Sequence, residues 1–244
     1  MTTIANTPSV LIRIVPSIVA VLLIVSFSRF AFWQLDRAQK KIELQNAFEN
    51  PGTYGQVVDG MEPPVFAAVQ ATGKYLGERQ VLIENAILNG KLGYFVITPF
   101  VFDSGAAPIL VNRGWVAKLR NGNLPDVSVS DEPRQILGKR GHLARVGVRP
   151  GEAFSAQDTW PKVAVWPTLD DIAIQFESPF QTWVLLLEPG QDDGFVRQWK
   201  PNDAGPSTHY GYALQWFAMA TVVAIIFGWR VTKGWRGERK KGSV

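Results

Sequence analysis

The chain has 244 residues, with 25 Lys and Arg against 21 Asp and Glu, a formal net charge of +4, and no Cys. This length suits one ordinary domain with membrane anchors, or two small domains without them. The absence of Cys excludes disulfides, thiolate metal sites and the attachment of c-type haem.

Two apolar runs, one near each end of the chain, predict transmembrane helices. The first predicted span is 10–34, where Arg13 and Arg29 are the charged residues, and the second is 209–231. At about 1.5 Å per residue, each span is long enough to cross a hydrocarbon core of about 30 Å. A cleaved signal peptide is the alternative for the first run, but that run is long and no small-x-small cleavage motif follows it.

The distribution of charge predicts the orientation in the membrane. Residues 36–208 carry 17 basic and 20 acidic side chains, a net charge of −3, so the positive balance lies in the flanking parts. Six basic residues lie from position 230 onward: Arg230, Lys233, Arg236, Arg239, Lys240 and Lys241. By the positive-inside rule the tail 232–244 is cytoplasmic, which places both termini in the cytoplasm and the central domain in the periplasm. Anionic lipid, rather than nucleic acid, is the expected neighbour of the tail.

One cluster of charge opposes this orientation. Arg37, Lys40 and Lys41 follow the first span on the side that we assign as the outer one. Because the intervening segment is longer than the loops to which the rule applies, the C-terminal cluster is given more weight.

The central part of the chain has the pattern of a β domain. Residues 35–50 keep a helical period and extend the first helix, and 51–208 form the predicted domain. Short runs rich in Val, Ile and Phe predict strands at 65–73, 79–88, 94–102, 108–116, 134–146, 181–188 and 195–200. Asn89-Gly90, between two of these runs, predicts a type I′ hairpin and sequential antiparallel pairing. Thr168 is expected to cap a short helix.

These patterns together predict the fold class. The chain is expected to be an α+β membrane protein, in which two transmembrane helices flank a single, mainly antiparallel β domain outside the membrane.

His209 is one of two histidines, and it stands where the second span begins. Tyr212 at i+3 and Trp216 at i+7 would share its helical face. An imidazole above aromatic rings suits a porphyrin, with His209 as an axial ligand of haem iron. The alternative is an interfacial His among the aromatic residues that gather at membrane surfaces.

A second candidate group lies at the outer end of the first span. Arg29, Trp33 and Arg37 are spaced at i, i+4 and i+8 and so rise along one helical face. Two guanidinium groups there could pair with carboxylates such as haem propionates. An anchoring Trp flanked by Arg residues that contact lipid phosphate would give the same pattern.

The segment 111–116, VNRGWV, reads as a strand interrupted by Gly114, where a bulge or a close backbone approach is expected. In a regular strand Arg113 and Trp115 would project to the same side, which suggests a cation–π pair or a patch that binds a partner; the alternative is a purely structural role. No nucleophile, metal-protease or dinucleotide motif is present, and His142 reads as a strand or turn residue. The sequence therefore assigns no reaction and predicts a protein that is not an enzyme.

Taken in order, these segments resemble the SURF1/Shy1 family of cytochrome c oxidase assembly factors, including its bacterial members. The resemblance rests on FWQLDRAQKK, GKYL, GYFVITPF, VNRGWV, WPTLDDIA and HYGYALQWFAMA, which span most of the chain. It implies a factor of the bacterial inner membrane that binds haem a and assists its insertion into oxidase subunit I, with His209 at the family's histidine. Haem a synthase is a second candidate partner. The alternatives are a scaffold that holds oxidase subunits without haem, and a membrane-anchored enzyme.

Overall fold

The computed structural model describes residues 10–58, 60–143, 151–155, 159–201 and 205–241, with side chains from 14 to 233 within these ranges. The chain forms two compact units. One unit joins residues 1–43 to residues 202–244, and the other comprises Leu44–Pro201. Each unit is described by itself below.

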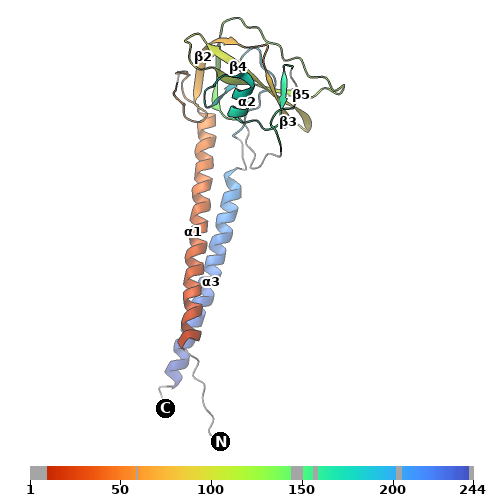
Figure 1. Ribbon diagram of the computed structural model, residues 1–244. Helices are drawn as coiled ribbons and strands as arrows, with labels where there is room; N and C mark the ends of the chain where they lie inside the picture. The colour runs from red at the N-terminus through yellow and green to blue at the C-terminus, as the bar shows by residue number, and fades with distance from the viewer. Residues whose placement is uncertain (1–9, 59, 144–150, 156–158, 202–204, 242–244) are drawn as a thin grey trace. The chain divides into compact units, whose positions relative to one another are not determined.

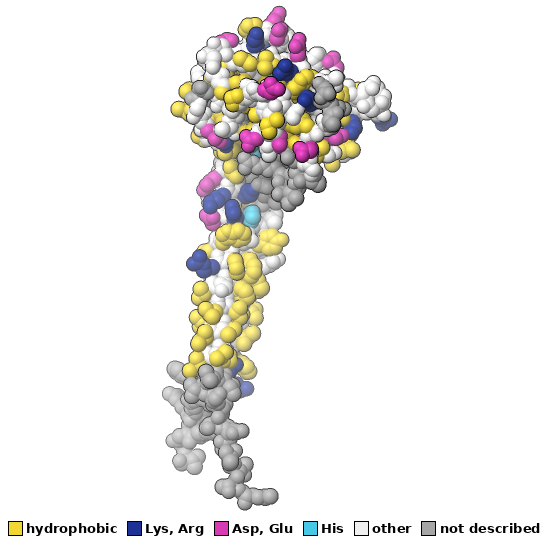
Figure 2. Space-filling view, in the orientation of Figure 1, with side chains coloured by type: hydrophobic (Ala, Val, Ile, Leu, Met, Phe, Trp, Pro, Cys, Tyr) yellow, Lys and Arg dark blue, Asp and Glu magenta, His cyan; other side chains and the backbone are white. Residues whose placement is uncertain are grey.

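The first unit contains most of helix α1 (Val10–Glu49) and helix α3 (Pro206–Lys241). Both helices contain windows that are apolar and long enough to cross a membrane, with mean hydropathies of 2.1 and 1.6. Large apolar side chains are exposed along both helices (Figure 2), among them Leu22, Phe32, Leu214, Ile225 and Trp229. Exposed apolar surface on a helix of this length is what a lipid environment requires.

The two long helices run antiparallel. His209, in the first turn of α3, contacts Gln34 of α1. Trp216, two turns further along α3, contacts Phe27 and Phe30, which come earlier in α1. Contacts that advance along one helix while they go back along the other define an antiparallel pair. The Val10 end of α1 and the Lys241 end of α3 therefore lie at the same end of the pair.

Helix α3 begins at Pro206, three residues before the predicted span, and it continues to Lys241 through the basic tail. Pro is favoured in the first turn of a helix because its missing N–H would have no intrahelical partner there. His209 therefore lies in the first turn of α3.

The second unit is built on an eight-stranded mixed sheet with the order β1-β2-β6-β8-β5-β4-β3-β7. The strands are β1 (Gly55–Gln56), β2 (Ala68–Tyr75), β3 (Val81–Leu88), β4 (Lys91–Phe102), β5 (Ile109–Ala117), β6 (Arg134–Gly141), β7 (Lys162–Ala164) and β8 (Val184–Leu187). Five of the eight pairings are antiparallel and three are parallel. The expected α+β class, with a mainly antiparallel sheet between two apolar helices, is confirmed.

An additional pairing between β2 and the end of β4 closes five strands into a barrel. Around the barrel, the neighbouring strands β6, β2, β4 and β5 have the order of a Greek key. Strand β8 lies between β5 and β6 and pairs with both. Five-stranded Greek-key barrels include the OB-fold. Figure 1 shows the barrel strands β2, β4 and β5 crossing within one domain, with α2 beside them.

The interior of the barrel is aromatic and aliphatic. Tyr75, Phe100 and Trp183 are almost fully buried there, with Val and Leu side chains from neighbouring strands. Tyr75 and Phe100 meet edge to face at 5.1 Å between ring centroids. This core fixes the register of the strands, because a slip by one residue would turn these rings outward.

The predicted hairpin is confirmed. Leu88 pairs with Lys91, so Asn89 and Gly90 form a two-residue turn, and both have positive φ, at 50° and 74°. These values are the type I′ geometry that an Asn-Gly pair favours between twisted strands.

The predicted short helix is also confirmed. Helix α2 (Leu169–Phe176) begins after Thr168, whose side chain accepts from the backbone N–H of Asp171. The Asp171 carboxylate in turn accepts from the backbone N–H of Thr168, which completes a capping box. Ile172 and Phe176 bury the apolar face of α2.

The expectation of sequential pairing is wrong for two strands. β2 pairs with β4 and β6 rather than with β3, and β8 lies parallel to β5. The predicted strand 195–200 is an extended segment with a single bridge at Val196. Barrel closure and long-range pairing decide these positions, and neither is encoded in local periodicity. The predicted strand 134–146 ends at Gly141, and its last positions, 144–146, lie outside the described residues.

Candidate functional site

The candidate site lies where α3 begins beside α1. His209 is half-buried, and its Nδ1 lies 2.8 Å from Oε1 of Gln34. Gln34 is itself buried, with 9% of its surface exposed. The contact between the His209 imidazole and the Gln34 amide is thus a polar interaction within a helix pair whose other side chains are mostly apolar.

Small residues surround this contact along both helices. Ala31 and Ala38 are buried on α1, on the same helical face as Gln34. Ala213 and Ala220 are buried on α3, one and three turns beyond His209. Small side chains let two membrane helices approach closely, so the pair is packed tightly enough to hold the imidazole and the amide in place.

The aromatic residues predicted to share the face of His209 have different surroundings. The Trp216 ring packs against Phe30 and Phe27, at 4.9 and 5.6 Å between centroids, so it lies within the helix pair. Tyr212 is 49% exposed on the flank of α3. The structure therefore uses Trp216 to join the helices and leaves the Tyr212 ring accessible.

The predicted stripe on α1 is exposed and does not join the contact between Gln34 and His209. Trp33 is half exposed, and the guanidinium of Arg37 lies 5.5 Å from its ring centroid. Arg29 is also exposed. At 100° per residue the stripe lies about a quarter turn round α1 from Gln34. These residues are therefore neighbours of the candidate site on the flank of α1.

In the β unit, Arg113 is buried in the core, with 2% of its surface exposed. Its Nε donates to the carbonyl of Asp193 at 2.7 Å, and its Nη1 donates to Gln80 Oε1 at 2.9 Å and to the carbonyl of Val127 at 2.8 Å. Its Nη2 donates to the carbonyl of Ser128 at 3.3 Å. Burial lowers the pKa of Arg113 to about 10.

This network assigns Arg113 a structural role. These acceptors and the Thr98 hydroxyl, which accepts from Nη1 at 3.5 Å, are all neutral, and they come from segments that are far apart in the sequence. One guanidinium with its planar fork of donors therefore ties these segments together. Its aromatic neighbours are Tyr75 and Phe195, at 5.6 and 5.1 Å to the ring centroids, rather than the predicted Trp115.

The expected irregularity at Gly114 is confirmed. The register of β4 and β5 shifts here, and Gly114 has a φ of 115°. A Cβ atom at this position would lie 2.9 Å from the carbonyl oxygen of Val196. Trp115 is 7% exposed and donates from Nε1 to the carbonyl of Ala86 at 3.0 Å. The segment is thus core structure, and the alternative of a partner-binding patch is wrong.

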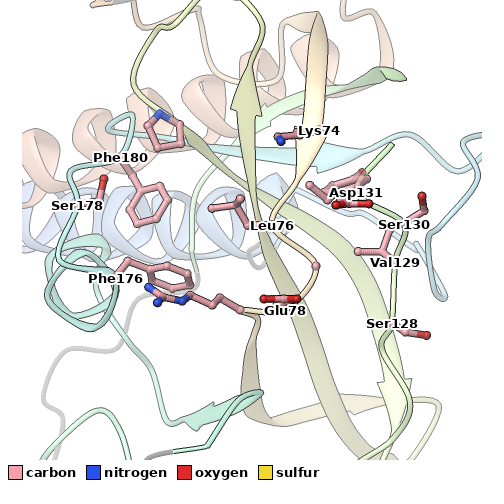
Figure 3. Close-up of a pocket in the computed structure, with 14 residues that line it drawn as sticks. Lys74, Leu76, Glu78, Ser128, Val129, Ser130, Asp131, Phe176, Ser178 and Phe180 are labelled. Carbon is pink, nitrogen blue, oxygen red and sulfur yellow. The ribbon is translucent and has the colours of Figure 1, made fainter. Parts of the chain in front are cut away.

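The β unit also contains a pocket of about 730 Å³ that the sequence did not indicate. Figure 3 shows the rings of Phe176 and Phe180 on one side, Leu76 between, and the segment from Val129 to Asp131 on the other. Lys74 and Arg79 line it together with Glu78 and Asp131, so its charges are balanced. A balanced pocket of this kind does not select an anion or a cation.

Gln34 is the site residue that the sequence analysis missed. A signal existed: a neutral hydrogen-bonding side chain lies between buried alanines at i−3 and i+4 on α1. In the described part of the chain, no group of three or more His, Cys, Asp or Glu is arranged to hold a bare metal ion.

Comparison with known proteins identifies the family. The model of the SURF1 family matches residues 21–221, which includes most of α1, the first part of α3 and the whole β unit. A SURF1-like protein of Rickettsia felis is 25% identical over 210 residues, which cover 80% of this chain and 88% of the relative.

Two eukaryotic relatives match shorter stretches. The cytochrome oxidase assembly protein SHY1 of Saccharomyces cerevisiae is 30% identical over 93 residues, or 35% of this chain and 24% of that protein. A SURF1-like protein of Dictyostelium discoideum is 34% identical over 82 residues, or 34% of this chain and 30% of the relative. The family match covers well over half of the sequence, and the chain belongs to the SURF1 family.

Proposed function

We propose that this chain is an assembly factor for cytochrome c oxidase that binds haem a through His209 and assists its insertion into subunit I. Family membership and the name of the yeast relative support the assembly role. The observation that supports the cofactor is the place of His209, half-buried at the end of an apolar helix pair with one ring nitrogen already held by Gln34.

The residues present fit a haem better than a bare metal ion. A bare ion needs several protein ligands, whereas haem iron has four nitrogen ligands of its own and needs only an axial one. A single His among exposed apolar side chains supplies that ligand and a surface for the ring. When bound, haem supplies an iron atom that accepts the imidazole nitrogen.

The remaining predicted residues take supporting roles in this proposal. Tyr212 is accessible beside His209, and Trp216 maintains the helix packing behind it. Arg29 and Arg37 are exposed cations on the flank of α1 that would attract propionates, with Trp33 beneath Arg37. A single protein ligand also suits a factor that must release its cargo.

We place the protein in the bacterial inner membrane, with both termini in the cytoplasm and the β unit in the periplasm. The antiparallel pairing brings the start of α1 and the end of α3 to one side, and the basic residues after position 229 favour the cytoplasm for that side. Oxidase subunit I is the proposed partner, haem a synthase is a second candidate, and no catalytic role is proposed.

The test is an optical spectrum of protein purified in detergent from cells that make haem a. We expect His209→Ala to reduce haem content by at least about tenfold, because a lost ligand removes most of the iron affinity. Thr208→Ala, at an exposed neighbouring position, is the matched control and should keep the wild-type content. Unchanged haem in His209→Ala would contradict the proposal.

A scaffold that holds oxidase subunits without haem is the second candidate. It is favoured by the tip of the β3–β4 hairpin, where Ile87 and Leu92 pair across the strands and are 69% and 55% exposed. Exposed apolar side chains at a hairpin tip suit a protein contact. Under this alternative, copurification with subunit I survives His209→Ala and is lost in Ile87→Asp.

A further inference from the structure

We propose that Gln34 is a positioning residue that holds His209 in the tautomer that presents an unprotonated Nε2. This inference rests on the proposed function, because it describes how the same imidazole is prepared for haem iron. Its first test, however, needs no haem.

The tautomer follows from the contact itself. Nδ1 of His209 lies 2.8 Å from Oε1 of Gln34, which is a hydrogen-bond distance. An amide oxygen only accepts, so the ring nitrogen must donate and Nδ1 carries the proton. In a neutral imidazole the other nitrogen then has a free lone pair, and Nε2 is the atom that can bind a metal.

The surroundings of Gln34 allow its side chain to fix the tautomer of His209. Gln34 is buried, and it lies in the interior of α1, so the helical backbone fixes the origin of its side chain. Ala31 and Ala38, one turn on either side, keep the helices close without competing for the imidazole by hydrogen bonding. In such apolar surroundings little water competes for the ring, so even a modest hydrogen bond can select one tautomer of a neutral imidazole.

A neutral amide has a particular consequence for a metal ligand. Histidines that bind metals generally donate their second N–H to a carbonyl or carboxylate, which fixes the ring and raises its basicity. An amide oxygen orients the ring in the same way while adding no charge near the membrane. Its milder effect on basicity suits iron that must be bound and then released.

The first experiment measures the tautomer directly in protein without haem. The chain has two histidines, so His142→Gln leaves His209 as the one remaining imidazole for ¹⁵N labelling. We expect ¹⁵N shifts of a protonated Nδ1 and an unprotonated Nε2, and we expect the proton to move to Nε2 in Gln34→Leu. A proton on Nε2 in the parent, or no change in Gln34→Leu, would overturn the inference.

The second experiment uses protein loaded with haem in cells that make haem a. Gln34→Leu should weaken haem binding by about 10- to 100-fold, the usual effect of losing such a partner. Gln34→Glu should keep the haem and make its midpoint potential more negative, because a carboxylate makes the ring a stronger donor. Gln39→Leu, at an exposed position on α1, is the control and should change neither quantity.

The two experiments separate the inference from the function on which it rests. Wild-type affinity and potential in both Gln34 variants would overturn the positioning role while leaving haem binding intact. A Nδ1-protonated His209 in folded wild-type protein that binds no haem would support the positioning role and refute the proposed cofactor.

Discussion

The two units of this protein use buried polar side chains in different ways. In the β unit, Arg113 has four short contacts with neutral oxygens and is almost fully enclosed. In the helix unit, His209 is half-buried, and one of its nitrogens is held by Gln34. A fully satisfied group stabilises a fold, whereas a group that keeps one atom available can bind a ligand. The comparison gives Arg113 a structural role and supports the proposal that His209 binds a ligand.

Replacement of Arg113 with Met should have the largest effect on stability. It leaves several buried acceptors without donors, each of which costs roughly 1–3 kcal/mol, so we expect a loss of more than about 3 kcal/mol. Denaturant unfolding in detergent measures this loss. Arg120→Met, at an exposed site, should change the free energy of unfolding by less than about 0.5 kcal/mol. Equal effects of the two substitutions would remove the distinction between the units.

Replacement of Gly114 with Ala should be the next most destabilising change, at about 2–3 kcal/mol. The new side chain would be strained at a φ of 115° and would press on the carbonyl of Val196. Gly122→Ala separates these causes, because Gly122 also has a positive φ, of 79°, but has nothing within 4 Å of the added atom. Thermal unfolding should show a clearly smaller loss for Gly122→Ala.

Replacement of Tyr75 with Phe tests the barrel interior through pH. The hydroxyl is buried and has no hydrogen-bond partner among the described residues, so near neutral pH we expect no loss and a gain of up to about 1 kcal/mol. Burial raises the pKa of Tyr75 to about 12. The folded state therefore keeps a proton that the unfolded chain loses above about pH 10, and stability falls as the pH rises towards 12.

The Tyr75→Phe variant cannot lose that proton. Its advantage over wild type should grow between pH 9 and 11, as measured by denaturant unfolding at each pH. A constant difference across this range would show that Tyr75 titrates normally in the folded protein.

Replacement of Gln34 with Leu should have the smallest effect on stability, below about 1 kcal/mol. Hydrogen bonds between membrane helices contribute about 0.6 kcal/mol on average. Unfolding in detergent measures this effect, and the same preparation can be examined for haem. A loss as large as that of Arg113→Met would mean that the contact between Gln34 and His209 is structural.

Local sequence patterns predicted much of the fold. Asn89-Gly90 specified its hairpin and Thr168 specified the start of α2, because both depend on the conformations of neighbouring residues. The parallel pairing of β5 with β8 and the closure of β2 on β4 were not predictable, because they join segments distant in sequence. The segment 195–200 has the composition of a strand but forms only a single bridge.

The candidate site also contains residues that the sequence indicated and one that it did not. The place of His209 at the start of the second span made it a candidate, and helical spacing placed Arg29, Trp33 and Arg37 on one face, which the structure leaves exposed. Spacing along one helix could not identify Gln34, because its contact with His209 depends on which face of α1 packs against α3. Trp216 was predicted beside His209, and only the packing against Phe27 and Phe30 shows that its ring lies between the helices.

Chemical rescue tests most directly whether the His209 imidazole is the ligand of haem iron. His209→Gly removes the side chain and leaves room for free imidazole, so protein from cells that make haem a can be titrated with imidazole and followed by its optical spectrum. We predict that His209→Gly loses the wild-type haem spectrum and that added imidazole restores it. A wild-type spectrum in His209→Gly without imidazole would contradict the account.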